Sequence, residues 1–218
     1  MKKNVLIFSL LIVLVSCNKR SLEESYIEFP ENQPIGVEEI QSVPENWFGT
    51  YKAIDSSIIS IEKDKIIQKW FNEEKISIQE KDSFPGLTFD KTFVIDNETK
   101  QKMKLVSKND SLFWEYQYSD TISIKDKVLK FYKNALIINT NIDGKIYVDV
   151  YKKENNYIRK FSIGSKEDFE KLKREIKIDF EYNYSDNDTT VVVKPTRADF
   201  RKILRKKGFT NEMIFTAQ

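Results

Sequence analysis

The chain has 218 residues, of which 40% are hydrophobic, 13% are aromatic and 32% are charged. This length suffices for one ordinary domain, or two small ones, with a buried core, and the aromatic content is too high for a disordered chain. The sequence contains no His and one Cys, which excludes imidazole-dependent catalysis, intrachain disulfides and Cys-cluster metal sites.

The first 17 residues have the form of a secretion signal that ends in a lipid-attachment site. Two lysines precede an eleven-residue apolar run, Val5–Val15. A membrane span needs about 20 such residues, so this run has the length of a signal-peptide core. The run leads into Leu14-Val15-Ser16-Cys17, which resembles the lipobox of bacterial lipoproteins. The resemblance implies cleavage after Ser16, so that residues 1–16 are a signal peptide, and attachment of lipid, including palmitate, to Cys17.

The alternative is an ordinary secretory signal with an incidental Cys17, although an unpaired sole thiol is unusual in an exported protein. The lipoprotein resemblance implies a location in the cell envelope, and Asn18 in place of Asp favours the outer over the inner membrane. Removing residues 1–16 takes away two lysines and leaves 34 basic against 34 acidic residues. No overall positive charge therefore favours nucleic acid as a partner.

Residues 17–44 are predicted to form a lipid-anchored tether. They hold three of the five prolines and many acidic residues, and they show no sustained periodicity. A flexible chain of this length spans roughly 30 Å. The alternative is that Tyr26–Phe29 docks on the domain as an edge segment.

From Trp47 onward, short runs of alternating apolar residues predict antiparallel strands. The predicted fold class is mainly β: an antiparallel meander sheet, either open or barrel-like, with two short C-terminal helices, forming one globular domain over residues 45–218. Clusters of polar residues predict the turns between strands. These clusters are Lys63-Asp64, Lys108-Asn109-Asp110, Ser119-Asp120, Lys125-Asp126-Lys127 and Asn141-Ile142-Asp143-Gly144.

Two capping boxes predict the helices, one over Ser165–Asp168 and one over Thr196–Asp199. Gly208 is predicted to end the second helix. Apolar residues at helical spacing mark the buried faces: Phe169, Leu172 and Ile176 in the first helix, and Phe200, Ile203 and Leu204 in the second. Six basic residues between Thr196 and Gly208 are typical of a capped surface helix. The alternative is that they contact anionic lipid beside the anchor.

Two patterns suggest binding surfaces. Gly49-Thr50-Tyr51 resembles the G-x-W that opens lipocalin-like barrels, with Tyr in place of Trp, and the resemblance implies an apolar ligand cavity. On a predicted strand, Leu112, Trp114, Tyr116 and Tyr118 share one face, which suits either core packing or an aromatic platform for a glycan or a protein partner.

The patterns that imitate catalytic or metal sites favour structural roles. The spacing from Asn139 to Gly144 matches half of a calcium loop, but Val150 stands where the bidentate Glu belongs, so a hairpin turn is expected. The carboxylates of Asp186-Asn187-Asp188 favour a solvated turn over a calcium site. Glu115 lies between two aromatic residues and is expected to face water. The S-x-x-K pattern of Ser60–Lys63 falls on a predicted strand without its companion motifs.

The sequence therefore predicts a non-enzymatic envelope lipoprotein that is a ligand-binding, protein-binding or structural module. The membrane is the expected partner through Cys17, and an envelope protein or a small apolar or glycan ligand is the expected second partner. No catalytic residue, metal site or cofactor is assigned. The alternative is a carboxylate-dependent hydrolase of an envelope or environmental polymer, since Asp and Glu are abundant enough to supply its acid and base.

Overall fold

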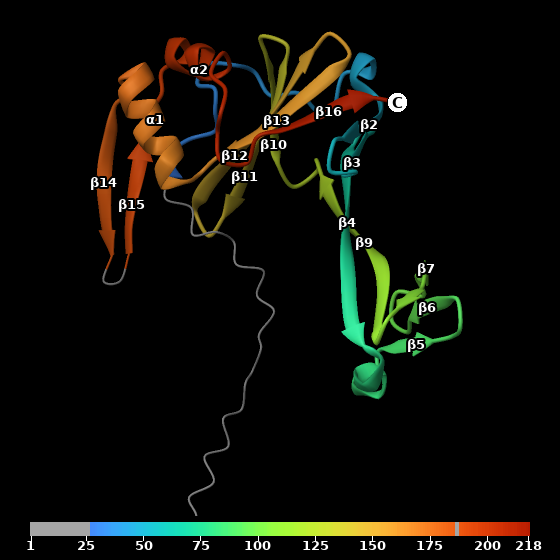
Figure 1. Ribbon diagram of the computed structural model, residues 1–218. Helices are drawn as coiled ribbons and strands as arrows, with labels where there is room; N and C mark the ends of the chain where they lie inside the picture. The colour runs from blue at the N-terminus through green and yellow to red at the C-terminus, as the bar shows by residue number, and fades with distance from the viewer. Residues whose placement is uncertain (1–26, 186–187) are drawn as a thin grey trace, which may run out of the picture.

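The computed structural model describes residues 27–185 and 188–218 and shows a mainly β protein (Figure 1). The predicted signal peptide over residues 1–16 and the predicted lipid site at Cys17 lie outside these residues. Within the described part of the chain, no helix is long and apolar enough to cross a membrane. A large antiparallel sheet dominates the fold, and two short α-helices come late in the chain, so the predicted fold class is confirmed.

The large sheet has ten strands, and β16, from the last part of the chain, joins its two halves by pairing with β13 and with β2. In their order across the sheet, the strands are β10 (Val128–Tyr132), β11 (Ala135–Ile142), β12 (Lys145–Glu154), β13 (Tyr157–Ile163), β16 (Met213–Ala217), β2 (Gly49–Ala53), β3 (Ile58–Ile61), β4 (Lys65–Ser77), β9 (Ser111–Ser123) and β8 (Val106–Lys108). Among the described residues, no backbone pairing joins the first strand of this order, β10, to the last, β8.

Alternate residues of β11, β12 and β13 supply two cores on opposite faces of the sheet. Leu136 and Ile138 of β11 join the core inside the curl of the sheet, whereas Ala135 and Ile137 join the core on its outer face. Because both faces are covered, β11 begins as a continuous apolar run and not as an alternation of apolar and polar residues. The core inside the curl also takes Trp47, at the end of the 3₁₀ helix η1 (Glu45–Trp47).

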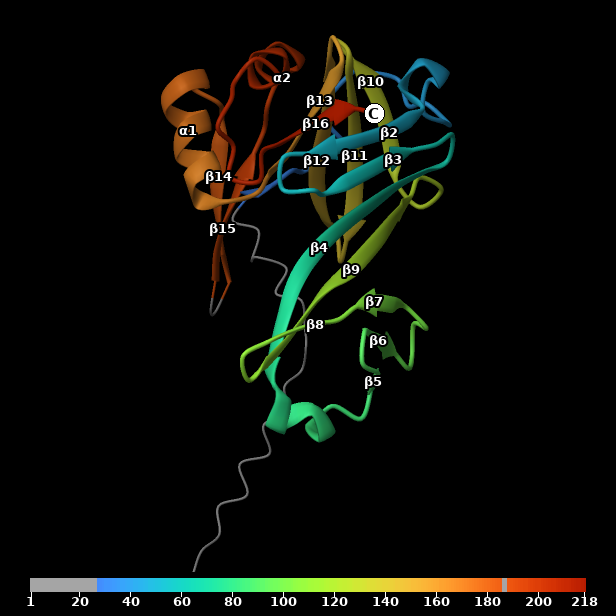
Figure 2. The same cartoon turned by 45° about the vertical axis from the view of Figure 1, so that its right-hand side comes forward.

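A second layer covers the outer face and consists of a three-stranded sheet and both helices (Figures 1 and 2). Its elements are β1 (Ile27–Glu28), β15 (Asp188–Val193), β14 (Phe180–Ser185), α1 (Lys166–Ile176) and α2 (Arg197–Ile203). Both predicted capping boxes are confirmed: the Ser165 hydroxyl accepts a hydrogen bond from the amide of Asp168, and Thr196 does the same for Asp199. The predicted apolar stripes of both helices are buried.

The predicted end of the second helix at Gly208 is wrong. α2 ends at Ile203, although Gly208 does have a positive φ of 74°. The reason is the buried Arg159, whose guanidinium donates hydrogen bonds to the carbonyl oxygens of Leu204 at 2.9 Å and Lys206 at 2.7 Å. These carbonyls have a cationic partner outside the helix, so the chain leaves the helix before the glycine.

The predicted tether over residues 17–44 is corrected for residues 27–44, which are packed against the domain. Ile27 and Phe29 are 1% and 2% exposed and belong to the outer core. The backbone of Gln33 donates to and accepts from the Asn139 side chain at 2.6 and 2.8 Å. Val43, just before the last proline of the segment, is also buried. The alternative, that Tyr26–Phe29 docks on the domain, therefore holds for residues 27–29. Residues 17–26 lie outside the description.

Strands β4 and β9 pair with each other over thirteen residues each. The far part of this pair extends beyond the curl as a two-stranded arm (Figure 2). The predicted turn at Ser119-Asp120 is wrong, because these residues pair with Lys69 and Gln68 inside this ladder. Aromatic side chains support the continuation, since the rings of Trp70 and Tyr118 stack across the two strands with centroids 5.8 Å apart. The predicted turn at Lys125–Lys127 lies between strands, as expected. The other two are shorter than predicted: Asn109-Asp110 and Asp143-Gly144 form the turns, whereas Lys108 ends β8 and Asn141-Ile142 end β11.

A small module lies at the far end of the arm (Figure 2). It has its own core, which includes Ile76, Trp114 and Met103 and shares no residue with the other two cores. Its elements are the 3₁₀ helix η2 (Ile78–Ser83) and the strands β5 (Leu87–Phe89), β6 (Phe93–Asp96) and β7 (Lys102–Lys104).

Candidate functional site

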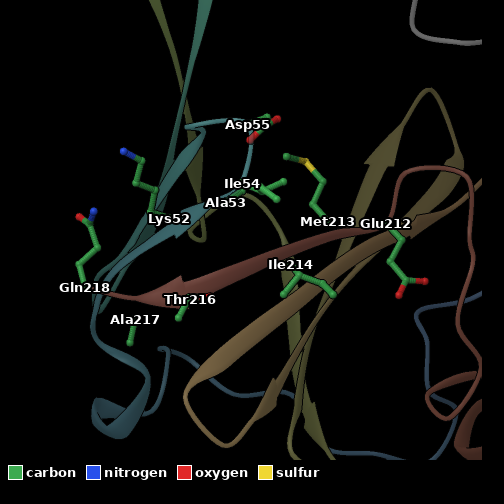
Figure 3. Close-up of a pocket in the computed structure, with 10 residues that line it drawn as sticks. All are labelled: Lys52, Ala53, Ile54, Asp55, Glu212, Met213, Ile214, Thr216, Ala217 and Gln218. Carbon is green, nitrogen blue, oxygen red and sulfur yellow. The ribbon is translucent and has the colours of Figure 1, made fainter.

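An open apolar groove lies between β16 and the turn that follows β2 (Figure 3). It has a volume of about 860 Å³, within the range of small-molecule sites. Ten side chains line it: Lys52, Ala53, Ile54, Asp55, Glu212, Met213, Ile214, Thr216, Ala217 and Gln218. The groove exists because β2 ends at Ala53, opposite Phe215, whereas β16 begins two residues earlier at Met213.

Two isoleucines at the groove are held in water. Ile54 is 105% exposed and Ile214 is 53% exposed, although each lies beside a buried residue, Ala53 or Phe215. Single exposed apolar residues are common, but two that line one groove give it an apolar surface. Met213 adds a flexible apolar side chain to the lining (Figure 3). This surface is suited to bind an apolar group.

The polar side chains of the groove differ at its two ends (Figure 3). At one end, the Glu212 carboxylate accepts hydrogen bonds from the amides of Gly208 and Phe209 and lies 3.5 Å from the Arg159 guanidinium. At the other end, Lys52 lies directly opposite Thr216. The ammonium of Lys52 has no hydrogen-bond or ion-pair partner among the residues that the structure describes.

A second polar cluster closes the core inside the curl where the arm departs. Lys160 of β13 donates a hydrogen bond of 2.6 Å to the side-chain oxygen of Gln68, and Ser162 donates one of 2.5 Å to Asp149. Burial lowers the pKa of Lys160, while the charges of Asp149 and Asp120 oppose that shift. Burial also raises the pKa of Tyr151 well above its usual value, and its hydroxyl has no hydrogen-bond partner among the described residues.

The predicted aromatic face of β9 serves two purposes along its length. Leu112 and Trp114 are buried in the module core, as the packing alternative expects. Tyr116 and Tyr118 are half-buried, and their hydroxyls donate hydrogen bonds to Asp96 at 2.7 Å and to Glu74. A backbone hydrogen bond from Thr99 and the bond from Tyr116 lower the pKa of Asp96. The bond from Tyr116 ties the module to the arm, and the bond from Tyr118 joins the two strands of the arm.

The residues that imitate a calcium loop are structural. Asn139 is 1% exposed and holds the backbone of Gln33, while Asp143 and Gly144 form the two-residue turn between β11 and β12. Asp186 and Asn187 lie outside the described residues. In the part of the chain that is described, no three His, Cys, Asp or Glu side chains are grouped as metal ligands.

The other residues singled out in the sequence stand apart from one another. Glu115 is exposed, as expected. Ser60 lies on β3, where its hydroxyl is 3.4 Å from that of Thr50 on β2. Gly49 opens β2 with a φ of 142°, a conformation that favours glycine, and the hydroxyl of the buried Tyr51 donates to the carbonyl of Trp47. These residues form no joint site.

The basic residues around α2 are partly engaged within the protein. Lys202 pairs with Asp199 at 2.8 Å, Lys206 pairs with Glu175 of α1 at 3.1 Å, and Arg197 lies over the ring of Tyr132. These contacts support a capped surface helix.

Sequence reasoning missed the groove. Its floor, β16, was not among the predicted strands, although Met213 and Phe215 alternate with Ile214 and Thr216. An isoleucine in the polar turn after β2 was the other available signal. Comparison with known proteins adds no assignment, since no family model, no curated protein and no solved structure matches the chain.

Proposed function

We propose that the chain is a non-enzymatic lipoprotein of the cell envelope, anchored through Cys17, whose β-rich domain binds a small apolar ligand in the groove beside β16. The observation that carries the proposal is the exposed pair Ile54 and Ile214 over a groove of about 860 Å³. Burying one such side chain contributes about 1.5–3 kcal/mol, so covering both supplies up to about 3–6 kcal/mol, and the apolar surface that the ligand itself buries must supply the rest and offset its ordering cost.

The sequence supports the anchor. The apolar run, the lipobox resemblance and the sole Cys at the cleavage position agree with one another. Asn18 favours the outer membrane. The test is labelled palmitate supplied to cells that express the chain: incorporation into the wild type and its loss in Cys17→Ser support the anchor, whereas equal labelling of both refutes it.

The groove is tested with a neutral apolar fluorophore, N-phenylnaphthylamine, and the mature chain, residues 17–218, carrying Cys17→Ser. Ile54→Ser and Ile214→Ser should each weaken binding, and the double variant should abolish it. The matched control is Ile78→Ser, which changes an isoleucine of the module, in η2, that is 43% exposed. Equal binding by the control and the double variant would remove the groove as the site.

A carboxylate-dependent hydrolase is the second proposal, because two carboxylates, Asp120 and Asp149, both lie close enough to Lys160 to raise its pKa. Asp149 already accepts a hydrogen bond from Ser162, and Lys160 supplies a counter-charge to both carboxylates. These contacts suit a structural role for the two carboxylates, so ligand binding is the first proposal and hydrolysis the second. Polymer hydrolysis that Asp120→Asn or Asp149→Asn abolishes would reverse the order.

A further inference from the structure

We infer that the ligand of the groove is a free amphiphile with one apolar chain and an anionic head, and that Lys52 selects the head. This inference rests on the proposed function, since it assigns chemistry to the same groove. It starts from the order of side chains along one face of the β2–β16 pair. Lys52 and Thr216 lie opposite each other on that face, and Ile214, two residues before Thr216 on β16, is on the same face. A polar end and an apolar end therefore adjoin.

The charges of the groove favour an anion at the Lys52 end. The ammonium of Lys52 has no partner among the described residues, and the side chain of Gln218 lies on the same end of the groove (Figure 3). Both acidic side chains at the groove are engaged within the protein. Glu212 faces Arg159 and two backbone amides, and Asp55 accepts a hydrogen bond from the amide of Ser57 in its own turn. Lys52 is thus the charged side chain of the groove that remains available to a ligand.

The length of the groove sets the length of the chain. Five residues of an extended strand, Met213–Ala217, span about 13 Å. A medium-length acyl chain is of this order and would cover Ile214 and Ile54 while its head stays beside Lys52. The apolar chain provides most of the binding, and the exposed ion pair adds preference between heads, worth about two- to five-fold in affinity.

The experiment compares two probes with the same chain and opposite heads, decanoate and decyltrimethylammonium, by calorimetry below their micelle concentrations. The protein is the mature chain, residues 17–218, with Cys17→Ser. We expect wild-type side chains to favour decanoate by at least about two-fold at low salt, with a smaller preference at high salt. Lys52→Glu should reverse the preference. The matched control Lys108→Glu, at an exposed lysine of β8, should leave the preference for decanoate unchanged.

The two ways of failing are distinct. If both probes bind, if binding of both falls in Ile54→Ser, and if Lys52→Glu leaves their ratio unchanged, the groove stands and the inference about the anionic head is overturned. If neither probe binds, or if Ile54→Ser binds both as the wild type does, the groove itself is overturned as the site, and the inference fails with it.

Discussion

Lys160 of β13 and Gln68 of β4 are joined by a hydrogen bond of 2.6 Å across the inside of the curled sheet. Three strands, β16, β2 and β3, separate β13 from β4 in the order of the sheet. The bond therefore connects two parts of the sheet that backbone pairing leaves apart. The Lys160 ammonium is partly removed from water at this position, and this burial lowers its pKa.

The pH dependence of the free energy of unfolding should depend on Lys160. With a lowered pKa in the folded state, the unfolded chain binds more protons than the folded chain between the two pKa values, so stability rises with pH across that interval. Lys160→Met should remove this rise, which is measured by urea unfolding at neutral pH and towards the ordinary lysine pKa of about 10.4. The control Lys108→Met should parallel the wild type, and a parallel course for Lys160→Met would contradict the prediction.

Removing the buried hydroxyl of Tyr151 should stabilise the protein by about 1 kcal/mol, because an unpaired buried polar group costs about 1–3 kcal/mol. Tyr151→Phe deletes that oxygen and keeps the ring. Tyr51→Phe is the matched control, since the Tyr51 hydroxyl donates to the carbonyl of Trp47 at 3.0 Å, and its loss should destabilise by about 0.5–1.5 kcal/mol. The free energy of unfolding should change in opposite directions; a loss in both variants would show that Tyr151 has a partner.

Arg159→Met should cost about 3–5 kcal/mol in the free energy of unfolding, as expected for breaking a buried ion pair from one side. The Arg159 side chain is 1% exposed, and its loss leaves the Leu204 and Lys206 carbonyls and the Glu212 carboxylate without their guanidinium. Arg174→Met removes an arginine that is 70% exposed and pairs with Glu175, so it should cost less than about 1 kcal/mol. Similar losses in the two variants would disprove the capping role of Arg159.

Truncation should show what the docked segment contributes. A chain that starts at residue 45 should be less stable than one that starts at residue 27, because it lacks the buried side chains of Ile27, Phe29 and Val43. Phe29→Ala alone should cost about 3–5 kcal/mol, because Phe29 is 2% exposed in the outer core. Equal denaturant midpoints for the two truncated chains would show that residues 27–44 contribute nothing to stability.

Excision of the outer arm should leave the rest of the protein folded. Replacing residues 73–115 with Asn-Gly joins Asn72 to Tyr116, a pair already opposed in the ladder, through a favoured two-residue turn. The module core shares no residue with the other two cores, so the shortened chain should unfold cooperatively and keep its groove. Loss of cooperative unfolding would show that the arm is needed for the fold.

Local patterns were sufficient for much of this structure. Alternation predicted most of the strands, although not β16, and the capping boxes at Ser165 and Thr196 predicted where both helices begin, because both signals depend on residues a few positions apart. The turn at Asp143-Gly144 followed from residues that tolerate a positive φ. The same reasoning failed at Ser119-Asp120, where polar residues continue a strand because β4 pairs with all of β9.

By itself, the sequence determined the β class and the two helix starts, and its resemblance to a lipobox at Cys17 supports the proposed anchor. The tertiary structure decided what depends on residues far apart in the chain. It placed Ile27 and Phe29 in a core with residues more than one hundred positions away, ended α2 early through Arg159, and set β16 beside β2 so that Ile54 and Ile214 line one groove. Strand order and contacts between distant side chains depend on long-range packing, and local periodicity carries no information about which distant strand becomes the neighbour.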